Sequence, residues 1–298
     1  MVVFALLALL TVLGLLYFVD LLIVAGQRRQ LRPNAESIGL GAVTNFFDTL
    51  GIGSFAPTTA WLKLRKIIPD SYLPATLNSG HALPTIAQAL IFVNLVRVDA
   101  VLLAMCIAAA IAGALIGAPL VMRLPVRAVR GVVGVALLIA AVLYALANLG
   151  KLPAGGDALT LAQPLFAIAI GVHFVLGALM TFGIGLYAPS LILLSLLGLN
   201  PIAAFPIMMG ACAFLMPISG MRFVRSERVD LRVVLGLAIG GIPAVLLAAY
   251  VVKSLPLTAL RWGVVLVVLY AAALLLRAAL KQEEASAPAA EGAEAQGT

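Results

Sequence analysis

Two short segments of the chain carry the same polar, glycine-interrupted motif inside apolar sequence. Residues 49–59 read TLGIGSFAPTT and residues 181–191 read TFGIGLYAPSL, an offset of 181 − 49 = 132. Each motif predicts the start of a short helix, because Pro57 or Pro189 suits a first turn, where its missing N–H would be unpaired anyway. A helix start collects unpaired N–H groups and about half a positive charge, so it attracts anions. Two such starts facing each other would bind a small anion.

The side chains and glycines of the two motifs complete this candidate anion site. Glycine permits tight turns and close approach of the backbone to a ligand. The predicted binding residues of the motifs are Thr49, Gly51, Gly53, Thr58, Thr181, Gly183, Gly185 and Ser190. The alternative is that Gly, Ser and Thr only let helices pack closely. Recurrence at matched positions favours a binding site over packing alone.

A carboxylate adjoins the first break. Asp48 lies in NFFDTLGIG, whereas the matching position of the second copy holds Met180. Charged groups within membrane segments are costly and therefore point to function. Asp48 could carry a proton, hold a cation or cap the half-helix, and the sequence leaves these roles open.

A second polar stretch, NSGHALPTIAQ at residues 78–88, interrupts another apolar segment. Asn78, His81 and Thr85 are three and four residues apart and share a helix face, with Gln88 one step further on. We include Asn45, Asn78, His81 and Gln88 among the predicted substrate-binding residues. His81 is also a coupling candidate beside Asp48, because histidine titrates near neutral pH.

The second copy replaces this stretch with PIMMGACAFLMPISGM, residues 206–221. Its methionines are interpreted as packing residues, and His173 as a hydrogen-bonded core residue. One polar wall and one apolar wall around a small ligand are therefore expected.

Composition sets the class of protein. Mean hydropathy is +1.16, with 63% hydrophobic and 10% charged residues, which is typical of a polytopic helical membrane protein. The apolar runs are continuous, as in residues 6–26, which argues against a β-barrel. The net charge of +7 comes from Lys and Arg at the ends of apolar runs, so it indicates membrane topology and no nucleic-acid partner.

The similarity between the two halves extends beyond the motif. Arg97-Val98-Asp99 recurs as Arg228-Val229-Asp230, and Leu124-Pro125 as Leu255-Pro256, both at an offset of 131 (228 − 97 and 255 − 124). The predicted organisation is an extra N-terminal transmembrane helix (1–26), repeat 1 (33–150), a linker (151–163), repeat 2 (164–281) and a disordered cytoplasmic tail (282–298). Each repeat contains a broken segment and three further apolar segments, the first of them at residues 73–95 and 203–223.

Charge distribution decides between two topologies. If each broken segment crosses the membrane once, the basic residues at 63–66 face away from those at 28–32. If each is a re-entrant helix pair, both clusters face the cytoplasm, as the positive-inside rule favours. Each repeat then makes three crossings, so the repeats are inverted, with the N-terminus outside and the C-terminus cytoplasmic. We favour this all-α fold of two inverted repeats over a single kinked crossing.

Motifs of common enzymes and metal sites are missing from the sequence. It contains no G-x-S-x-G, P-loop or metal-ligand spacing, so we predict no enzyme activity, no cofactor and no metal site. Cys106 and Cys212 are interpreted as small core residues. The expected partners are a small anionic substrate and membrane lipid, and a homo-oligomer remains open.

LGIGSFAPTTAWL (50–62) and FGIGLYAPSLILLSLLGLNPIAAFPIMMG (182–210), with the spacing of the segments that follow, resemble the sulfite exporter TauE/SafE family. That family typically carries a more glycine-rich break, so the chain resembles a divergent member. The resemblance implies a transporter, in the direction of export, of a small oxyanion such as sulfite, an organosulfonate or a related organic acid.

Other functions and the location follow from separate features. The alternatives are a transporter of a cation, metal or neutral solute that uses Asp48 and His81, or a non-transport membrane enzyme or assembly factor. Abundant Ala and an excess of Arg over Lys indicate a GC-rich bacterial genome and the inner membrane.

Overall fold

The computed structural model describes residues 2–117, 126–151, 156–180, 185–226, 228–254 and 257–284, and the regular structure in these ranges is helical. Helices long and apolar enough to cross a membrane are α1 (Val2–Gln27), α11 (Pro201–Arg225), α12 (Leu231–Ser254) and α13 (Leu257–Glu284). This bears out the predicted all-helical, polytopic membrane protein.

The remaining elements show the same order twice. They are α2 (Ala35–Thr49), α3 (Phe55–Leu64), η1 (Asp70–Tyr72), α4 (Leu73–Gly80), α5 (Ala82–Leu95), α6 (Ala100–Ala112), η2 (Gly113–Gly117), α8 (Val126–Asn148), α9 (Leu165–Met180) and α10 (Tyr187–Leu196). In the first copy α2 and α3 are the two parts of a broken segment, followed by α4–α5, α6 and α8. In the second copy α9 and α10 take that place, followed by α11, α12 and α13.

Two boundaries differ from the sequence expectation. The segment predicted as one piece over 73–95 is two helices, because Pro84 has no N–H to offer the carbonyl of Gly80. This interruption leaves His81 between α4 and α5. At the other end of the chain α13 reaches Glu284, so it includes residues 282–284, and the rest of the predicted tail lies outside the described residues.

Hydrogen bonds bring the outer ends of the first broken segment together. Arg65 at the end of α3 forms a salt bridge of 2.9 Å with Glu36 in the first turn of α2. At the same end, the Arg28 guanidinium after α1 donates to the carbonyls of Arg225 (2.9 Å) and Ser226 (2.8 Å) after α11. Both halves of this segment therefore return to the end where α1 and α11 finish.

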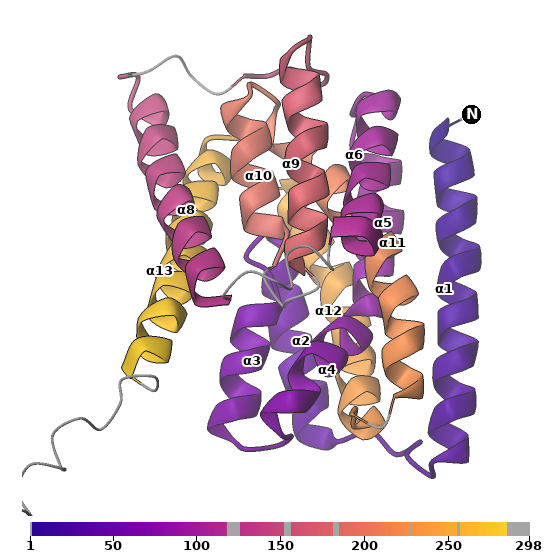
Figure 1. Ribbon diagram of the computed structural model, residues 1–298. Helices are drawn as coiled ribbons and strands as arrows, with labels where there is room; N and C mark the ends of the chain where they lie inside the picture. The colour runs from indigo at the N-terminus through magenta and orange to yellow at the C-terminus, as the bar shows by residue number, and fades with distance from the viewer. Residues whose placement is uncertain are drawn as a thin grey trace, which may run out of the picture.

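The second broken segment opens at the opposite end. There the Asn200 N–H, between α10 and α11, donates to the Ala158 carbonyl before α9 (2.8 Å), and the Asp99 N–H donates to Leu159 O (2.9 Å). Helix α11 separates the two ends by its 25 residues, or about 37 Å at 1.5 Å per residue. Figure 1 shows α2 and α3 in the lower part of the molecule and α9 and α10 in the upper part.

Each broken segment packs mainly on a helix of the other copy. Helix α2 lies along α12, and α9 lies along α6 and η2. Glycines make both contacts close: a Cβ at Gly240 would lie 1.9 Å from Ile38 O, and one at Gly113 would lie 1.8 Å from Phe174 O. The remaining large contacts join α8 to α13 and α5 to α11, which hold corresponding places in the two copies. The two copies are thus one interleaved unit.

We predict that Gly240→Ala lowers the thermal unfolding midpoint in detergent, because the added methyl group meets backbone and overpacking costs about 1–3 kcal/mol. Gly39→Ala on α2 is the matched control, since a Cβ there meets nothing within 4 Å. Alanine stabilises an open helical position by up to about 1 kcal/mol, so this midpoint should stay or rise. Equal midpoints for Gly240→Ala and the wild type would contradict the close α2–α12 contact.

Candidate functional site

The inner tips of the two broken segments meet at a small cavity among buried side chains. Its lining residues come from both breaks and from α5 and α11: Asp48, Gly53, Ser54, Phe55, Thr85, Met180, Gly185, Leu186, Tyr187, Cys212 and Met216. Its volume is about 20 Å³, which is room for about one water molecule. The tips therefore leave little free space between them in this conformation.

The Asp48 carboxylate is the charged side chain among those that line this cavity, and it is 3% exposed. Its Oδ1 accepts the backbone N–H of Ser54, the residue before α3, at 2.6 Å. Its Oδ2 accepts from Gln88 Nε2 at 2.9 Å. The carboxylate therefore caps the tip of the first broken segment, which is one of the roles left open by the sequence.

Gln88 connects the two broken segments. Besides Asp48, its Nε2 donates to Thr49 Oγ1 at 3.0 Å, which leaves Oε1 to accept the hydroxyl proton of Tyr187 at the start of α10. Both amide protons and the carbonyl oxygen are thus used, which fixes the orientation of the amide. One side chain of α5 holds a contact to each tip.

A second network fixes His81 beside α2 and α3. The Asn45 amide nitrogen donates to Gly41 O (2.8 Å), so its Oδ1 faces His81 Nδ1 at 3.1 Å. Nδ1 must then be the donor, because a carbonyl oxygen only accepts. That leaves His81 Nε2 to accept the hydroxyl proton of Thr58 at 3.0 Å.

The second copy contains the same hydroxyl–histidine pair with a different histidine. His173 Nδ1 faces the carbonyl of Ala169 at 2.7 Å, and His173 Nε2 accepts from Ser190 Oγ at 2.9 Å. Ser190 corresponds to Thr58 in the repeat, whereas His173 of α9 and His81 are not at corresponding positions. The hydroxyl at each matched position therefore bonds to a histidine, although the two histidines stand at different positions of the repeat.

These contacts limit which groups can donate to an anion. With neutral histidines, Thr58 and Ser190 each give their one hydroxyl proton to a ring nitrogen. Apart from the Ser54 N–H, which Asp48 accepts, the backbone N–H groups at the helix starts remain, since the N-cap side chains, Ser54 for α3 and Leu186 for α10, cap neither start. The backbone is thus the available donor set for an anion.

The structure joins most of the predicted binding residues but not all of them. One network contains Asn45, Asp48, Thr49, Thr58, His81 and Gln88, while Gly53 and Gly185 line the cavity. Gly51 lies under Leu191, and Asn78 donates to Pro74 O outside the network. Thr181 and Gly183 lie outside the described residues.

Tyr187 is not among the binding residues predicted from the sequence, although its hydroxyl completes the network around Gln88. The signal was present in the repeat, because 55 + 132 = 187 and the first copy holds Phe55 there. Tyr187 has a hydroxyl that the matching Phe55 lacks, which indicates a polar contact made only by the second copy. Cys212 and Met216, also missed, line the apolar side of the cavity.

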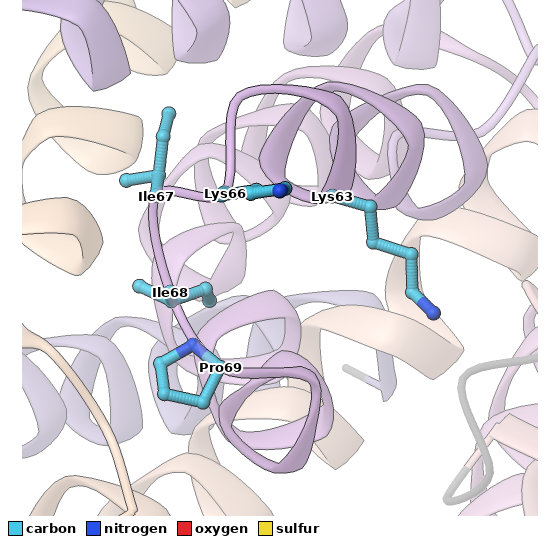
Figure 2. Close-up of a pocket in the computed structure, with 5 residues that line it drawn as sticks. All are labelled: Lys63, Lys66, Ile67, Ile68 and Pro69. Atoms are coloured by element: carbon cyan, nitrogen blue, oxygen red, sulfur yellow. The ribbon is translucent and has the colours of Figure 1, made fainter.

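The larger hollow on the protein is a surface feature away from the tips. It measures about 400 Å³ and is lined by Lys63, Lys66, Ile67, Ile68 and Pro69. Figure 2 shows these residues on the turn that leaves α3. Its place at the outer end of α3 separates it from the candidate site. Within the described ranges, no group of three His, Cys, Asp or Glu side chains could hold a metal ion.

The fold and the site define a class: a polytopic helical membrane protein with two broken segments whose tips face a buried cavity. Residues 165–296 match the family model described as Sulfite exporter TauE/SafE. The match confirms the resemblance predicted from the sequence, and it covers the second copy. It implies a membrane transporter of sulfite or related anions. No curated protein and no solved structure matches the chain.

We predict that the matched glycines Gly53 and Gly185 tolerate alanine differently. A Cβ meets nothing within 4 Å at either position, but Gly53 has φ +87° whereas Gly185 is not in the positive-φ region. A left-handed backbone costs a non-glycine residue about 1–2 kcal/mol. Thermal unfolding in detergent should therefore show a lower midpoint for Gly53→Ala than for Gly185→Ala. The opposite order would contradict the backbone geometry of the first break.

Proposed function

We propose that the protein is a secondary transporter of a small oxyanion such as sulfite, an organosulfonate or a related organic acid. The observation that carries this proposal is the meeting of two helix starts, α3 and α10, at one small cavity lined by both tips. Helix starts favour negative charge through their N–H groups and dipoles. The family match over residues 165–296 supports the same class of substrate.

In this proposal the two copies are inverted repeats, and each broken segment is a re-entrant helix pair. The salt bridge between Glu36 and Arg65 supports this for the first copy, because it joins the outer ends of α2 and α3. Basic residues gather at that end, which we assign to the cytoplasm by the positive-inside rule. The N-terminus then lies outside, and the bilayer is a bacterial inner membrane.

Transport would proceed by alternating access around the two tips. Inverted repeats with discontinuous helices place substrate near the midplane and expose it to either side by moving one element against another. A cavity of about 20 Å³ holds about one water molecule, so this conformation corresponds to a step of the cycle without bound substrate. If the anion moves without a coupled ion, an inside-negative potential favours its export by about 2.3 kcal/mol per charge per 100 mV.

One observation favours a second candidate, a transporter of a cation or neutral solute. Asp48 lines the cavity, and Thr58 and Ser190 present lone pairs because their protons go to histidines. A cation would suit these oxygens. A flux measurement with both kinds of solute separates the two candidates.

We expect purified protein in proteoliposomes to carry radiolabelled sulfite or methanesulfonate with saturable kinetics. Gly185→Leu should reduce this flux about tenfold or more, because the side chain would fill the small cavity. Gly171→Leu on the exposed side of α9 is the matched control, since a Cβ there meets nothing within 4 Å. Folded wild type that carries no anion would refute the oxyanion proposal.

The re-entrant topology predicts which loops share a side of the membrane. With a membrane-impermeant maleimide on oriented vesicles, Arg32→Cys and Leu64→Cys should react from one side and Leu149→Cys from the other. Leu64 and Leu149 are 76% and 58% exposed, whereas native Cys106 and Cys212 are buried. A single kinked crossing would instead place positions 32 and 64 on opposite sides.

A further inference from the structure

The two tips differ in one respect that bears on how an anion binds. At the first tip the Asp48 carboxylate accepts the Ser54 N–H at 2.6 Å. At the second tip the matching position is Met180, a cavity-lining residue that carries no charge. The first tip therefore already holds an anion that belongs to the protein.

Asp48 also connects to the second tip. Its other oxygen accepts from Gln88, and Gln88 in turn accepts the hydroxyl proton of Tyr187 on α10. A carboxylate requires the amide nitrogen of Gln88 to face it, which turns the amide oxygen toward Tyr187. A protonated Asp48 brings its own O–H donor and removes that requirement. The protonation state of Asp48 is therefore communicated to the start of α10.

Among the described residues that line the cavity, no side chain carries a positive charge that would offset a second anion. The titratable side chains that line the cavity with Asp48 in the described ranges are Tyr187 of α10 and Cys212 of α11, while His81 contacts α2 at Asn45. The charged side chains of α3 and α12 in the described ranges, such as Lys63 and Arg232, belong to the outer ends of those helices. No Lys or Arg is among the residues that line the cavity.

Resting on the proposed function, we propose that Asp48 is the proton-coupling residue, an internal anion that the substrate replaces. A substrate anion beside an ionised Asp48 would meet a like charge in a buried site, which is unfavourable. When Asp48 takes up a proton, the like charge disappears and the Ser54 N–H becomes available to the substrate. Gln88 and Tyr187 are positioning residues that transmit this change to the second tip.

The charge balance of the cycle follows directly. One proton binds Asp48 from the side where the cavity is open, one monoanion enters, and both leave on the other side. The loaded transporter, with protonated Asp48 and one bound monoanion, carries the same net charge as the empty transporter with ionised Asp48. Net transport of a monoanion is then electroneutral and follows the sum of the proton and anion gradients.

The test is the proton-to-anion ratio in proteoliposomes that contain a trapped pH indicator. Methanesulfonate is the main probe, because its charge does not change over the working pH range, and sulfite is run beside it. Wild type should move one proton with each methanesulfonate, respond to a pH gradient and ignore an imposed potential. Asp48→Asn should move the anion without a proton and respond to potential instead. His81→Gln should keep the ratio of the wild type, whatever its rate.

Each outcome bears on the inference. Wild-type anion flux without proton movement would overturn it even if no variant folds, while leaving the proposed function standing. Coupling kept by Asp48→Asn would also overturn it, and coupling lost in His81→Gln alone would overturn it and assign the proton to His81. Absence of any anion flux would remove both the proposed function and this inference.

Tyr187→Phe, which keeps the ring and removes the hydroxyl, should preserve the proton-to-anion ratio and shift the pH dependence of the transport rate. An unchanged pH profile would show that Tyr187 does not transmit the protonation of Asp48 to the second tip.

Discussion

Backbone N–H and C=O groups have no water to bond with inside a membrane, so a helix that stops there needs protein around its ends. Here two segments stop near the middle of the fold. The first half of each broken segment is packed against helices of the other copy, α2 on α12 and α9 on α6. Glycines at these contacts allow backbones to approach more closely than any other residue would permit. Packing between the two copies therefore supplies the protein surroundings that the broken segments need.

The two copies share an architecture but have diverged in chemistry. The first tip has a carboxylate, an amide and a histidine network around Asp48 and His81, whereas the second has Met180, Cys212 and Met216. Duplication lets one copy keep an open helix start while the other acquires a titratable group. In the proposed coupled cycle, this asymmetry gives one cavity both a titratable group and an open helix start.

Residue types predicted much of this arrangement. Hydropathy and continuous apolar runs predicted the membrane class, and the repeated Gly-Ile-Gly motif predicted that two segments would break at corresponding positions. The polar residues Asp48, Asn45, His81 and Gln88 were selected because isolated polar groups in apolar segments need partners. The split at His81 was missed, although Pro84 provides a local reason for it. Tyr187 was missed because its hydroxyl acquires meaning only from Gln88, 99 residues away in the chain.

The sequence by itself determined the helical membrane class, the presence of two copies and the places where the backbone breaks. These features depend on composition and on neighbouring residues, which local rules describe well. Only the tertiary structure decided that each broken helix packs on the opposite copy, that Asp48 caps Ser54, and that each hydroxyl meets a histidine. Those contacts join residues from different helices, and their partners are set by how whole helices pack, since a buried polar group bonds to whatever donor or acceptor the packing brings within reach.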